Sequence, residues 1–324
     1  MNMKNSPLVT SMKCVTVACP QPKDFIGLMV DECSWEIIDK GGIDSNQEKV
    51  WGIAAGSAGK QYSVIRSPNA DRGMIRVVKG KNRIRNSPMS TRWSGIEIVV
   101  SNDLQSLCQR LEKNNKFEVI KPVNAADFTH AGANIHDFFH GKSPGGTHIM
   151  FTMAITQPET YDFPKSPNWV GHIFDVHLDV DNTGNSRIFY QDTLGMELVF
   201  DDLLTEGLFY DTWDLNVKTP PVNMSIFKGD APGFGLGGIE MRSFDKATMD
   251  PALPEKRNLD PGTCITSFST KNIYQTFKAI ESSSHASVLT EPTELKQNIY
   301  NGGLVFTAIG PEGERIEFTE SWLS

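Results

Sequence analysis

Acidic and imidazole side chains occur in this sequence where strand-like segments can bring them to one face. In the segment FDVHLDV, Asp175 and His177 are two residues apart, and side chains two apart along a strand project to the same side. Glu240 and Glu317 occupy the centres of two similar strings, Ile-Glu-Met and Ile-Glu-Phe. Carboxylates that crowd together resist ionisation unless a positive charge joins them. If such acids share one concavity, a divalent cation or a nearby guanidinium must supply that positive charge.

The identity of the cation depends on the ligands, and a structural alternative is open. An oxygen-rich site favours Mg²⁺ or Mn²⁺, whereas the addition of His177 favours Zn²⁺ or Ni²⁺. Arg242 and Arg315 each lie two residues from one of the glutamates. Either guanidinium can neutralise a carboxylate through a bidentate ion pair. A bound metal and an arginine ion pair are thus competing predictions for the same acids.

Two further groups have less specific interpretations. His136 and His140 share one face of a predicted strand, IHDFFHG, and are more commonly polar positions of a half-exposed strand than ligands. Phe209, Tyr210 and Trp213 can cover a cavity and contact an apolar substrate, or they can form a satellite hydrophobic cluster. The sequence has no GxxxxGKS/T, GxGxxG, HExxH or GxSxG, which argues against common nucleotide, zincin and serine-hydrolase chemistry.

The elements that position these residues follow a repeated order. After the strand at Phe174–Val180, a helix ends near Gly195, the strand MELVF follows, and strand-like text continues to GGIEMRSF. The segment from Gly262 repeats this order. Its helix carries an apolar stripe at helical spacing: Ile273, Phe277 and Ile280. The C-terminal half therefore reads as two β-α-β-β-β modules.

The N-terminal half shows the same plan. The strand GIEIVVS at Gly95–Ser101 precedes a helix capped by Asn102 or Asp103, whose apolar stripe has helical spacing: Leu104, Leu107, Cys108 and Leu111. Segments rich in Pro, Asn, Ser or charge mark the joints between modules: Lys81–Arg92, Gln157–Asn168 and Asp245–Pro261. The 324 residues suit two domains. We expect one over residues 1–156 and another over residues 169–324.

The string RIFYQDTLGMELV resembles the start of a glyoxalase/bleomycin-resistance domain of the vicinal-oxygen-chelate superfamily. Further matching features are Phe189-Tyr190, Leu194-Gly195, the turn Pro311-Glu312-Gly313 and Glu317. The resemblance covers about Gly171–Trp322, and the N-terminal half matches only by its module plan. It implies an α+β fold in which four βαβββ modules form two glyoxalase-like half-barrel domains.

The resemblance also implies where ligands belong, in the first and last strands of each module. By this count the C-terminal positions are Asp175, Glu240, Thr263 and Glu317, with His177 available if the register shifts. The corresponding N-terminal positions fall near Cys14, Ile75 or Arg76, Ile96 and Met150, which do not make a metal site. The resemblance therefore implies that Asp175, Glu240 and Glu317 converge on a divalent cation in one concavity of the C-terminal domain. We expect the degenerate N-terminal domain to help close the cavity.

Three functions are consistent with this resemblance. The first is a glyoxalase-like lyase or isomerase, in which a metal polarises an oxygen pair of a small organic substrate and Glu240 or Glu317 moves a proton. The second is a metal-free protein that binds or sequesters a small molecule, like bleomycin-resistance proteins. The third is a scaffold without chemistry. Ring-cleaving dioxygenase activity is disfavoured, because Asp175 and Thr263 stand where that class has histidines.

Composition narrows the partners and the compartment. The net charge of −8 gives little attraction to a polyphosphate, so nucleic acid is not expected. No apolar run approaches the roughly 18 residues of a membrane span, and the polar start predicts no signal peptide. Five cysteines without paired spacing fit a reducing, cytoplasmic compartment.

Overall fold

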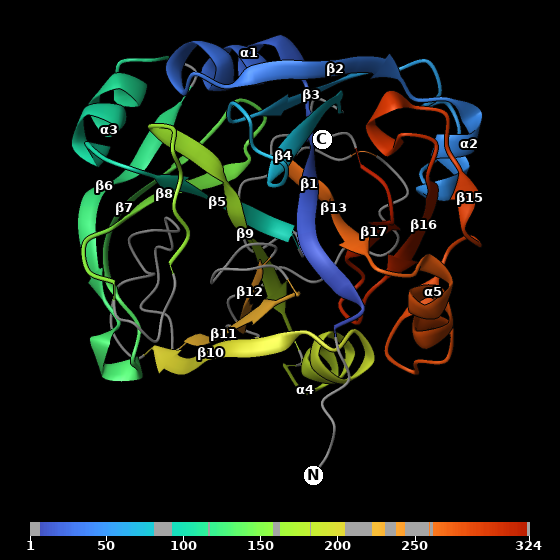
Figure 1. Ribbon diagram of the computed structural model, residues 1–324. Helices are drawn as coiled ribbons and strands as arrows, with labels where there is room; N and C mark the ends of the chain where they lie inside the picture. Colours follow the sequence, from blue (N-terminus) through green and yellow to red (C-terminus); the bar gives the residue numbers. More distant parts are fainter. Residues whose placement is uncertain are drawn as a thin grey trace.

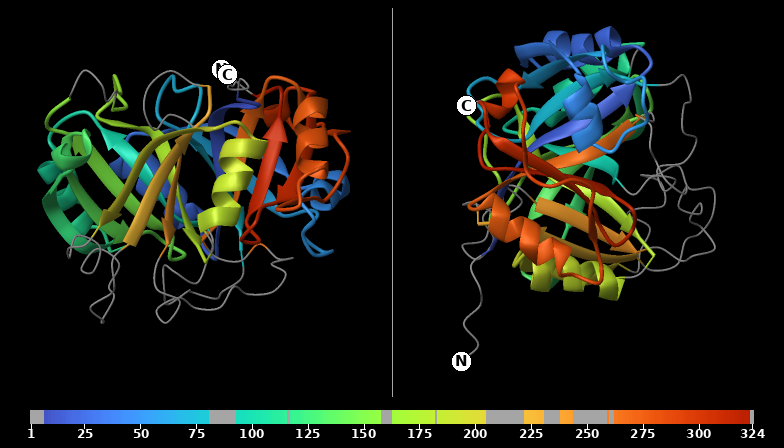
Figure 2. Two further views of the ribbon diagram at one scale, coloured as in Figure 1. Left: turned by 90° about the horizontal axis from the view of Figure 1, so that it is seen from below. Right: turned by 90° about the vertical axis from the view of Figure 1, so that its right-hand side faces the viewer.

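The computed structural model describes residues 7–80, 93–115, 117–157, 163–181, 183–204, 222–230, 238–243, 259 and 262–322. These residues form a nine-stranded sheet, which we call the first sheet, and an eight-stranded sheet, which we call the second sheet. Figure 1 shows the blue N-terminal strands beside the orange and red C-terminal strands, whereas green and yellow strands form the second sheet. Two further views of the molecule show that both sheets are curved (Figure 2).

The first two modules occupy the N-terminal half. The first contains β1 (Val9–Cys19), α1 (Pro22–Gly27), η1 (Leu28–Glu32), β2 (Glu36–Gly42), α2 (Ser45–Val50), β3 (Gln61–Arg66) and β4 (Met74–Lys79). The second contains β5 (Trp93–Val100), α3 (Leu104–Glu112), β6 (Glu118–Asp127), η3 (Thr129–Ala131), β7 (Ile135–Lys142) and β8 (His148–Ala154). Each begins with a strand, continues through a helix and ends with three strands.

The last two modules follow the same order. The third contains β9 (Val170–Val180), α4 (Thr183–Arg187), the π-helical η4 (Ile188–Thr193), β10 (Glu197–Leu204), β11 (Val222–Lys228) and β12 (Gly238–Ser243). The fourth contains β13 (Gly262–Thr270), α5 (Ile273–Glu281), β14 (Ser287–Val288), β15 (Thr293–Glu294), η5 (Asn298–Tyr300), β16 (Leu304–Ile309) and β17 (Arg315–Thr319). The predicted α+β class of four βαβββ modules in two half-barrels is confirmed.

Local sequence signals explain the two longest helices. Asp103 caps α3 by accepting a hydrogen bond from the Ser106 amide, and Asn272 caps α5 by accepting one from the Gln275 amide. The apolar stripe predicted for α3 is buried, as are Ile273 and Ile280 of α5. No helix among the described residues is long and apolar enough to cross a membrane.

The pairing of the modules differs from the expected division into two consecutive halves. In the first sheet β1 pairs antiparallel with β13, so the first module joins the fourth. In the second sheet β5 pairs antiparallel with β9, so the second module joins the third. Each sheet therefore combines one module from residues 1–156 with one module from residues 169–324. Every module offers the same kind of first strand, so local sequence patterns cannot choose between the two pairings.

The main hydrophobic core links the two sheets. Val15, Ile96, Val176 and Phe268 come from the first strands of the four modules, and all are buried in one cluster. Alternation along each strand directs the opposite side chains away from this cluster, into the concave faces of the two sheets. Asp175, Glu240 and Glu317 extend into these concave faces.

A buried carboxyl group joins the third and fourth modules at the turn after β16. Glu314 accepts a hydrogen bond from the Tyr190 hydroxyl at 2.5 Å and another from the Glu312 amide at 2.8 Å. Burial raises the pKa of Glu314 to about 7 from an ordinary 4.5, although both hydrogen bonds oppose the increase. The folded protein therefore keeps a proton on Glu314 that the unfolded chain releases at lower pH.

We expect Glu314→Gln to flatten part of the pH dependence of stability. The contribution of Glu314 is complete below pH 4.5 and is lost as pH rises through about 7, because only the folded state raises this pKa. The difference amounts to about 3 kcal/mol. Urea unfolding of both proteins between pH 4.5 and 8 measures it. Parallel pH profiles for the wild type and the variant would contradict the prediction.

Candidate metal centre

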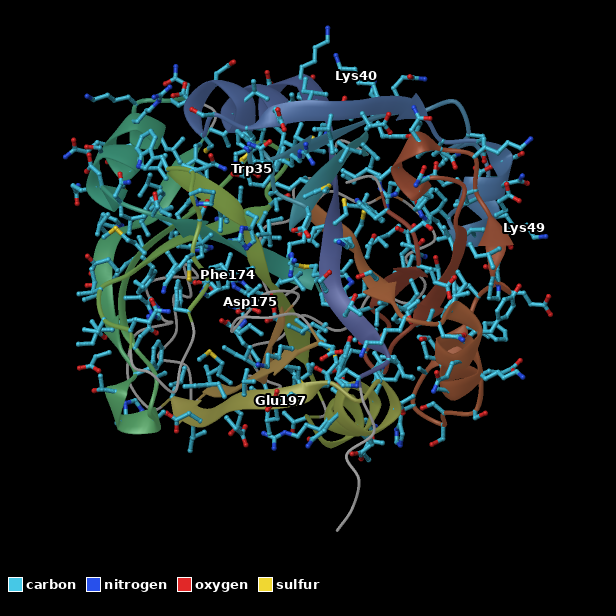
Figure 3. The ribbon with its side chains drawn as sticks, viewed as in Figure 1. Trp35, Lys40, Lys49, Phe174, Asp175 and Glu197 are labelled. Carbon is cyan, nitrogen blue, oxygen red and sulfur yellow. The ribbon has the colours of Figure 1, made fainter. Side chains whose placement is uncertain are left out.

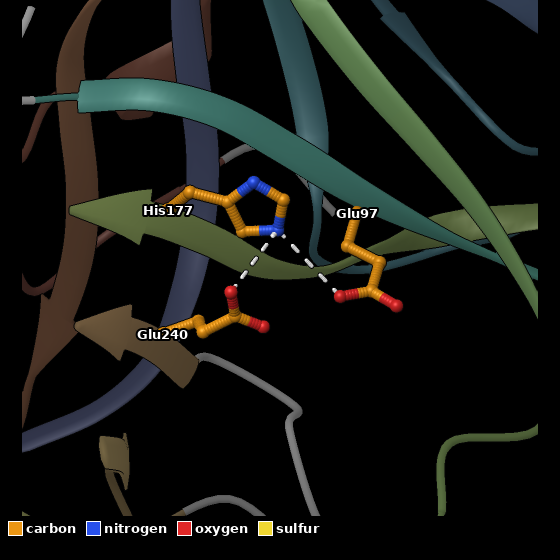
Figure 4. A group of neighbouring side chains, drawn as sticks. All are labelled: Glu97, His177 and Glu240. Carbon is orange, nitrogen blue, oxygen red and sulfur yellow. Dashed lines mark ion pairs between the residues drawn. The ribbon is translucent and has the colours of Figure 1, made fainter. Parts of the chain in front are cut away.

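Three buried side chains in the second sheet bring potential metal ligands together. Glu97 extends from β5, His177 from β9 and Glu240 from β12 (Figure 4). The His177 Nε2 atom lies 3.6 Å from Glu97 Oε2 and 4.0 Å from Glu240 Oε1. One ligand atom from each residue lies within 4.8 Å of the other two. Three strands from two modules therefore form one compact group.

Strand register explains why these residues meet. His177 is opposite Glu240 across the parallel pair of β9 and β12, and opposite Gly95 across the antiparallel pair of β9 and β5. Glu97 lies two residues beyond Gly95, on the same face of β5. A Cβ atom at Gly95 would lie only 2.8 Å from His177 Nδ1. The absence of a side chain at position 95 gives the imidazole ring its space.

We expect Gly95→Ala to displace His177 and weaken metal retention. A Cβ contact of 2.8 Å forces the ring or the strand to shift, and such overpacking typically costs about 1–3 kcal/mol. Gly141→Ala is a matched control, because its Cβ would instead meet Phe117 and the Glu118 carbonyl. Elemental analysis and thermal melts of both variants measure the effects. The prediction fails if Gly141→Ala lowers metal content as much as Gly95→Ala.

The electrostatics of the cluster favour a cation. Burial, and then the nearby Glu240, raise the pKa of Glu97 to about 8. Burial also raises the pKa of Glu240, and Arg242 opposes that increase. Burial, followed by Arg242, lowers the pKa of His177 well below its usual value, so the imidazole is neutral and can act as a ligand. Two acids beside a neutral imidazole form a group whose charged state a divalent ion would stabilise.

Asp175 lies beside this group without belonging to it. It is opposite Glu97 in the register of β5 and β9, and Figure 3 shows its position near the middle of the second sheet. Its Oδ1 atom is buried and has no hydrogen-bond partner among the described residues. Burial, then Glu97 and Glu240, raise the pKa of Asp175 well above its usual range. Of the two candidate ligands predicted on this strand, His177 belongs to the group of three, and Asp175 lies two residues before it.

Arg242 is a positive group close to Glu240. Its Nη1 atom lies 3.6 Å from Glu240 Oε1, as the arginine alternative predicted. Its other nitrogens are held elsewhere: Nε and Nη2 donate to Asp179 Oδ1 at 3.2 and 3.0 Å, and Nη2 donates to Ser94 Oγ at 2.6 Å. Arg242 therefore pairs mainly with Asp179, and Glu240 Oε1 has no hydrogen bond from any described residue.

Apolar and aromatic side chains flank the cluster. One group of buried residues comes from the second and third modules: Ala126, Phe128, Ala133, Phe138, Met150, Phe200, Met224 and Ile226. Phe128 and Phe200 meet edge to face at 5.7 Å, and His130 Nε2 contacts Asp202 Oδ2 at 2.7 Å. These contacts join the connection after β6 to β10, so the two ends of the second sheet approach each other.

Of the two histidines predicted on β7, His140 is buried, whereas His136 is half-buried. His136 stacks between Phe128 and Phe163, at centroid distances of 5.4 and 5.9 Å. His140 stacks on His148 at 4.9 Å, and the Nε2 of His140 lies 3.1 Å from the Nδ1 of His148. Phe209, Tyr210 and Trp213, predicted to cover a cavity, lie outside the described residues.

Glu317 is not part of the cluster, which corrects the predicted convergence of Asp175, Glu240 and Glu317. It lies in β17 of the first sheet, where its Oε1 atom is 3.1 Å from Arg76 Nη2. The neutralising guanidinium comes from β4 rather than from the predicted Arg315. The expectation failed because Glu240 and Glu317 occupy equivalent strands of two different sheets.

Glu97 is the ligand candidate that the sequence interpretation missed. The count from the family pattern fell on Ile96, and a slip of one residue moves a position to the other face of a strand. Ile96 points into the main core. A signal was present, because Glu97 is an acid inside the otherwise apolar strand GIEIVVS. The N-terminal half therefore contributes to this cluster, contrary to the expectation that the C-terminal half holds it alone.

Comparison with solved structures places the fold among known proteins. Glyoxalase I from Zea mays superposes with a TM-score of 0.62 and 14% identity, over 96% of this chain and 92% of that one. A putative dioxygenase from Bacillus subtilis superposes with a TM-score of 0.58 and 10% identity, over 97% and 85% of the two chains. No family model and no curated protein matches the sequence. At these identities the similarity establishes a shared fold and leaves the chemistry to the site.

Proposed function

We propose that this chain, which has the vicinal-oxygen-chelate fold of tandem glyoxalase-like modules, holds a divalent metal at Glu97, His177 and Glu240. The observation that carries the proposal is the distance among their ligand atoms, all within 4.8 Å. Ligands bound about 2.0–2.2 Å from one metal lie roughly 3–4.4 Å apart, so small side-chain movements suffice. Glu240 Oε1, which is buried and has no hydrogen-bond partner in the described part of the chain, also fits a ligand role.

The three ligand side chains limit which metal ions fit this site. Two carboxylates and one imidazole suit Zn²⁺, Ni²⁺ or Mn²⁺ better than Mg²⁺, which prefers oxygen ligands alone. When bound, such an ion would polarise an oxygen pair of a small organic substrate. Dioxygenase chemistry is not proposed, because the described cluster contains one imidazole and not the two histidines of the iron-binding triad.

The proposed reaction class is that of a glyoxalase-like lyase or isomerase. Such reactions need a base that removes a proton next to a carbonyl group. Glu240 would take this role after detaching from the metal, because its Oε1 atom has no hydrogen-bond partner among the described residues and burial raises its pKa. Thr152 donates a hydrogen bond to Glu97, so Glu97 is the more firmly held of the two acids. Glu317 cannot assist, because it belongs to the other sheet.

Metal analysis of the purified protein tests this function. We expect about one equivalent of metal per chain, removal by a chelator, and recovery with Zn²⁺, Ni²⁺ or Mn²⁺. At a free metal concentration 100 times Kd, binding adds about 2.7 kcal/mol of stability. Conversion of small carbonyl substrates should require the restored metal. Failure of every ion to bind would exclude this proposal.

A second candidate is a metal-free protein that binds or sequesters a small molecule. The observation that favours it is the apolar group around Phe128, Phe138 and Phe200 beside the acids. A ligand of this kind would raise the thermal midpoint of chelator-treated protein. Stabilisation by small aromatic compounds without any metal requirement would support this candidate over the enzyme.

A further inference from the structure

The concave face of the first sheet has positions equivalent to the three residues of the candidate metal centre and to Met150 beside them. Ser267 is opposite Glu317 in the first sheet as His177 is opposite Glu240 in the second. Cys14 is opposite Ser267 as Gly95 is opposite His177, so two residues farther along these strands Thr16 corresponds to Glu97. Arg76 is opposite Thr16 as Met150 is opposite Glu97. The equivalent set in the first sheet is Thr16, Arg76, Ser267 and Glu317.

Arg76 binds two other members of this set, Thr16 and Glu317, directly. Its Nη2 atom donates to Glu317 Oε1 at 3.1 Å and to Thr16 Oγ1 at 2.9 Å, and its Nε donates to Thr16 Oγ1 at 3.0 Å. Its Nη1 donates to the Tyr300 hydroxyl at 2.6 Å. The guanidinium lies over the ring of Trp51, 4.3 Å from its centroid. Arg76 is fully buried, and such a charge persists only where it is paired.

Both carboxylate oxygens of Glu317 also accept hydrogen bonds. Its Oε1 atom accepts from Ser267 Oγ at 2.7 Å in addition to Arg76. Its Oε2 atom accepts from Trp51 Nε1 at 2.5 Å and from the Tyr300 hydroxyl at 2.7 Å. Four donors therefore surround one fully buried carboxylate. The positive charge at the centre of this set belongs to a side chain that cannot dissociate.

We propose that the concave face of the first sheet is a cation site whose cation is the Arg76 guanidinium, so that it is permanently filled and closed to metals. The second sheet differs at two points. It has two carboxylates and an imidazole at the equivalent positions, and Asp179 holds its nearest guanidinium, Arg242, 3.6 Å from Glu240. The two sheets thus use one arrangement in two ways, with an internal cation in one and an exchangeable cation in the other.

Chemical rescue with guanidinium ion tests this inference, and the quantity measured is thermal stability rather than catalytic activity. Arg76→Ala leaves Glu317 buried beside a cavity of guanidinium shape. Guanidinium ion at low millimolar concentration should raise the thermal midpoint of this variant by roughly 2–4 °C in a saturable way. Urea, the neutral molecule of nearly the same shape, should not. The wild type and Arg76→Ala combined with Glu317→Gln should show no increase with either compound.

The outcomes are distinguishable. Equal responses to guanidinium and urea, or a response that survives Glu317→Gln, would overturn the inference. If Arg76→Ala does not fold, Mn²⁺ binding to folded Glu240→Ala protein replaces the test. We expect no bound Mn²⁺ in that variant. If a Mn²⁺ site remained and Glu317→Gln removed it, the concave face of the first sheet would be shown to bind metals. Absence of metal from the wild type would refute the proposed function and leave the guanidinium result standing.

Discussion

Glu317→Ala is expected to destabilise the protein by about 3–5 kcal/mol, because it leaves the guanidinium of Arg76 buried without a counter-charge. The two groups are 3.1 Å apart, and neither side chain is exposed to solvent. The substitution also removes the acceptor for Ser267, Trp51 and Tyr300. Urea unfolding of the wild type and the variant measures the loss.

The same substitution should leave metal content unchanged, because Glu317 lies in a different sheet from Glu97, His177 and Glu240. Glu317→Gln is the matched control. It keeps the size of the side chain and one acceptor oxygen while removing the charge, so its loss of stability should be smaller than that of Glu317→Ala. A folded Glu317→Ala protein that has lost its metal would show that Glu317 acts at the candidate centre after all.

Removal of any one of Glu97, His177 or Glu240 by alanine is expected to weaken metal binding by more than about 100-fold. Loss of a residue that only orients a ligand typically costs about 10–100-fold, and loss of a ligand should cost more. Titration of chelator-treated protein with Zn²⁺, Ni²⁺ or Mn²⁺ gives the affinities. The three variants should keep their fold, because each removes an acid or imidazole that burial already disfavours in its charged form.

Met150→Ala is the control for these ligand variants. Met150 is opposite Glu97 in the strand register and is buried in the apolar group beside the cluster. Its truncation should cost about 2–4 kcal/mol of stability and leave metal affinity within a few-fold of the wild type. Equal loss of metal in Met150→Ala and Glu97→Ala would mean that packing, rather than coordination, holds the cluster together.

Much of this architecture is readable from the sequence because it depends on local patterns. Alternation in FDVHLDV places His177 and Asp175 on one face of β9, and the stripe from Leu104 to Leu111 gives α3. The repeated strings around Glu240 and Glu317 correctly mark equivalent strands of two equivalent modules. The module order, the fold class and the candidate role of Glu240 follow from such signals.

The composition of each concave face depends on tertiary structure. Within each module, one edge of the first strand has no partner from the same module. Nothing within the module specifies which other first strand will pair with that edge. The observed pairing of β5 with β9 brings Glu97 to His177 and Glu240, while the pairing of β1 with β13 brings Arg76 to Glu317. The sequence by itself determined which residues face inward on each strand. Only the contacts between distant modules decided that Glu97 and Glu240 share a cluster and that Glu317 forms an ion pair with an arginine.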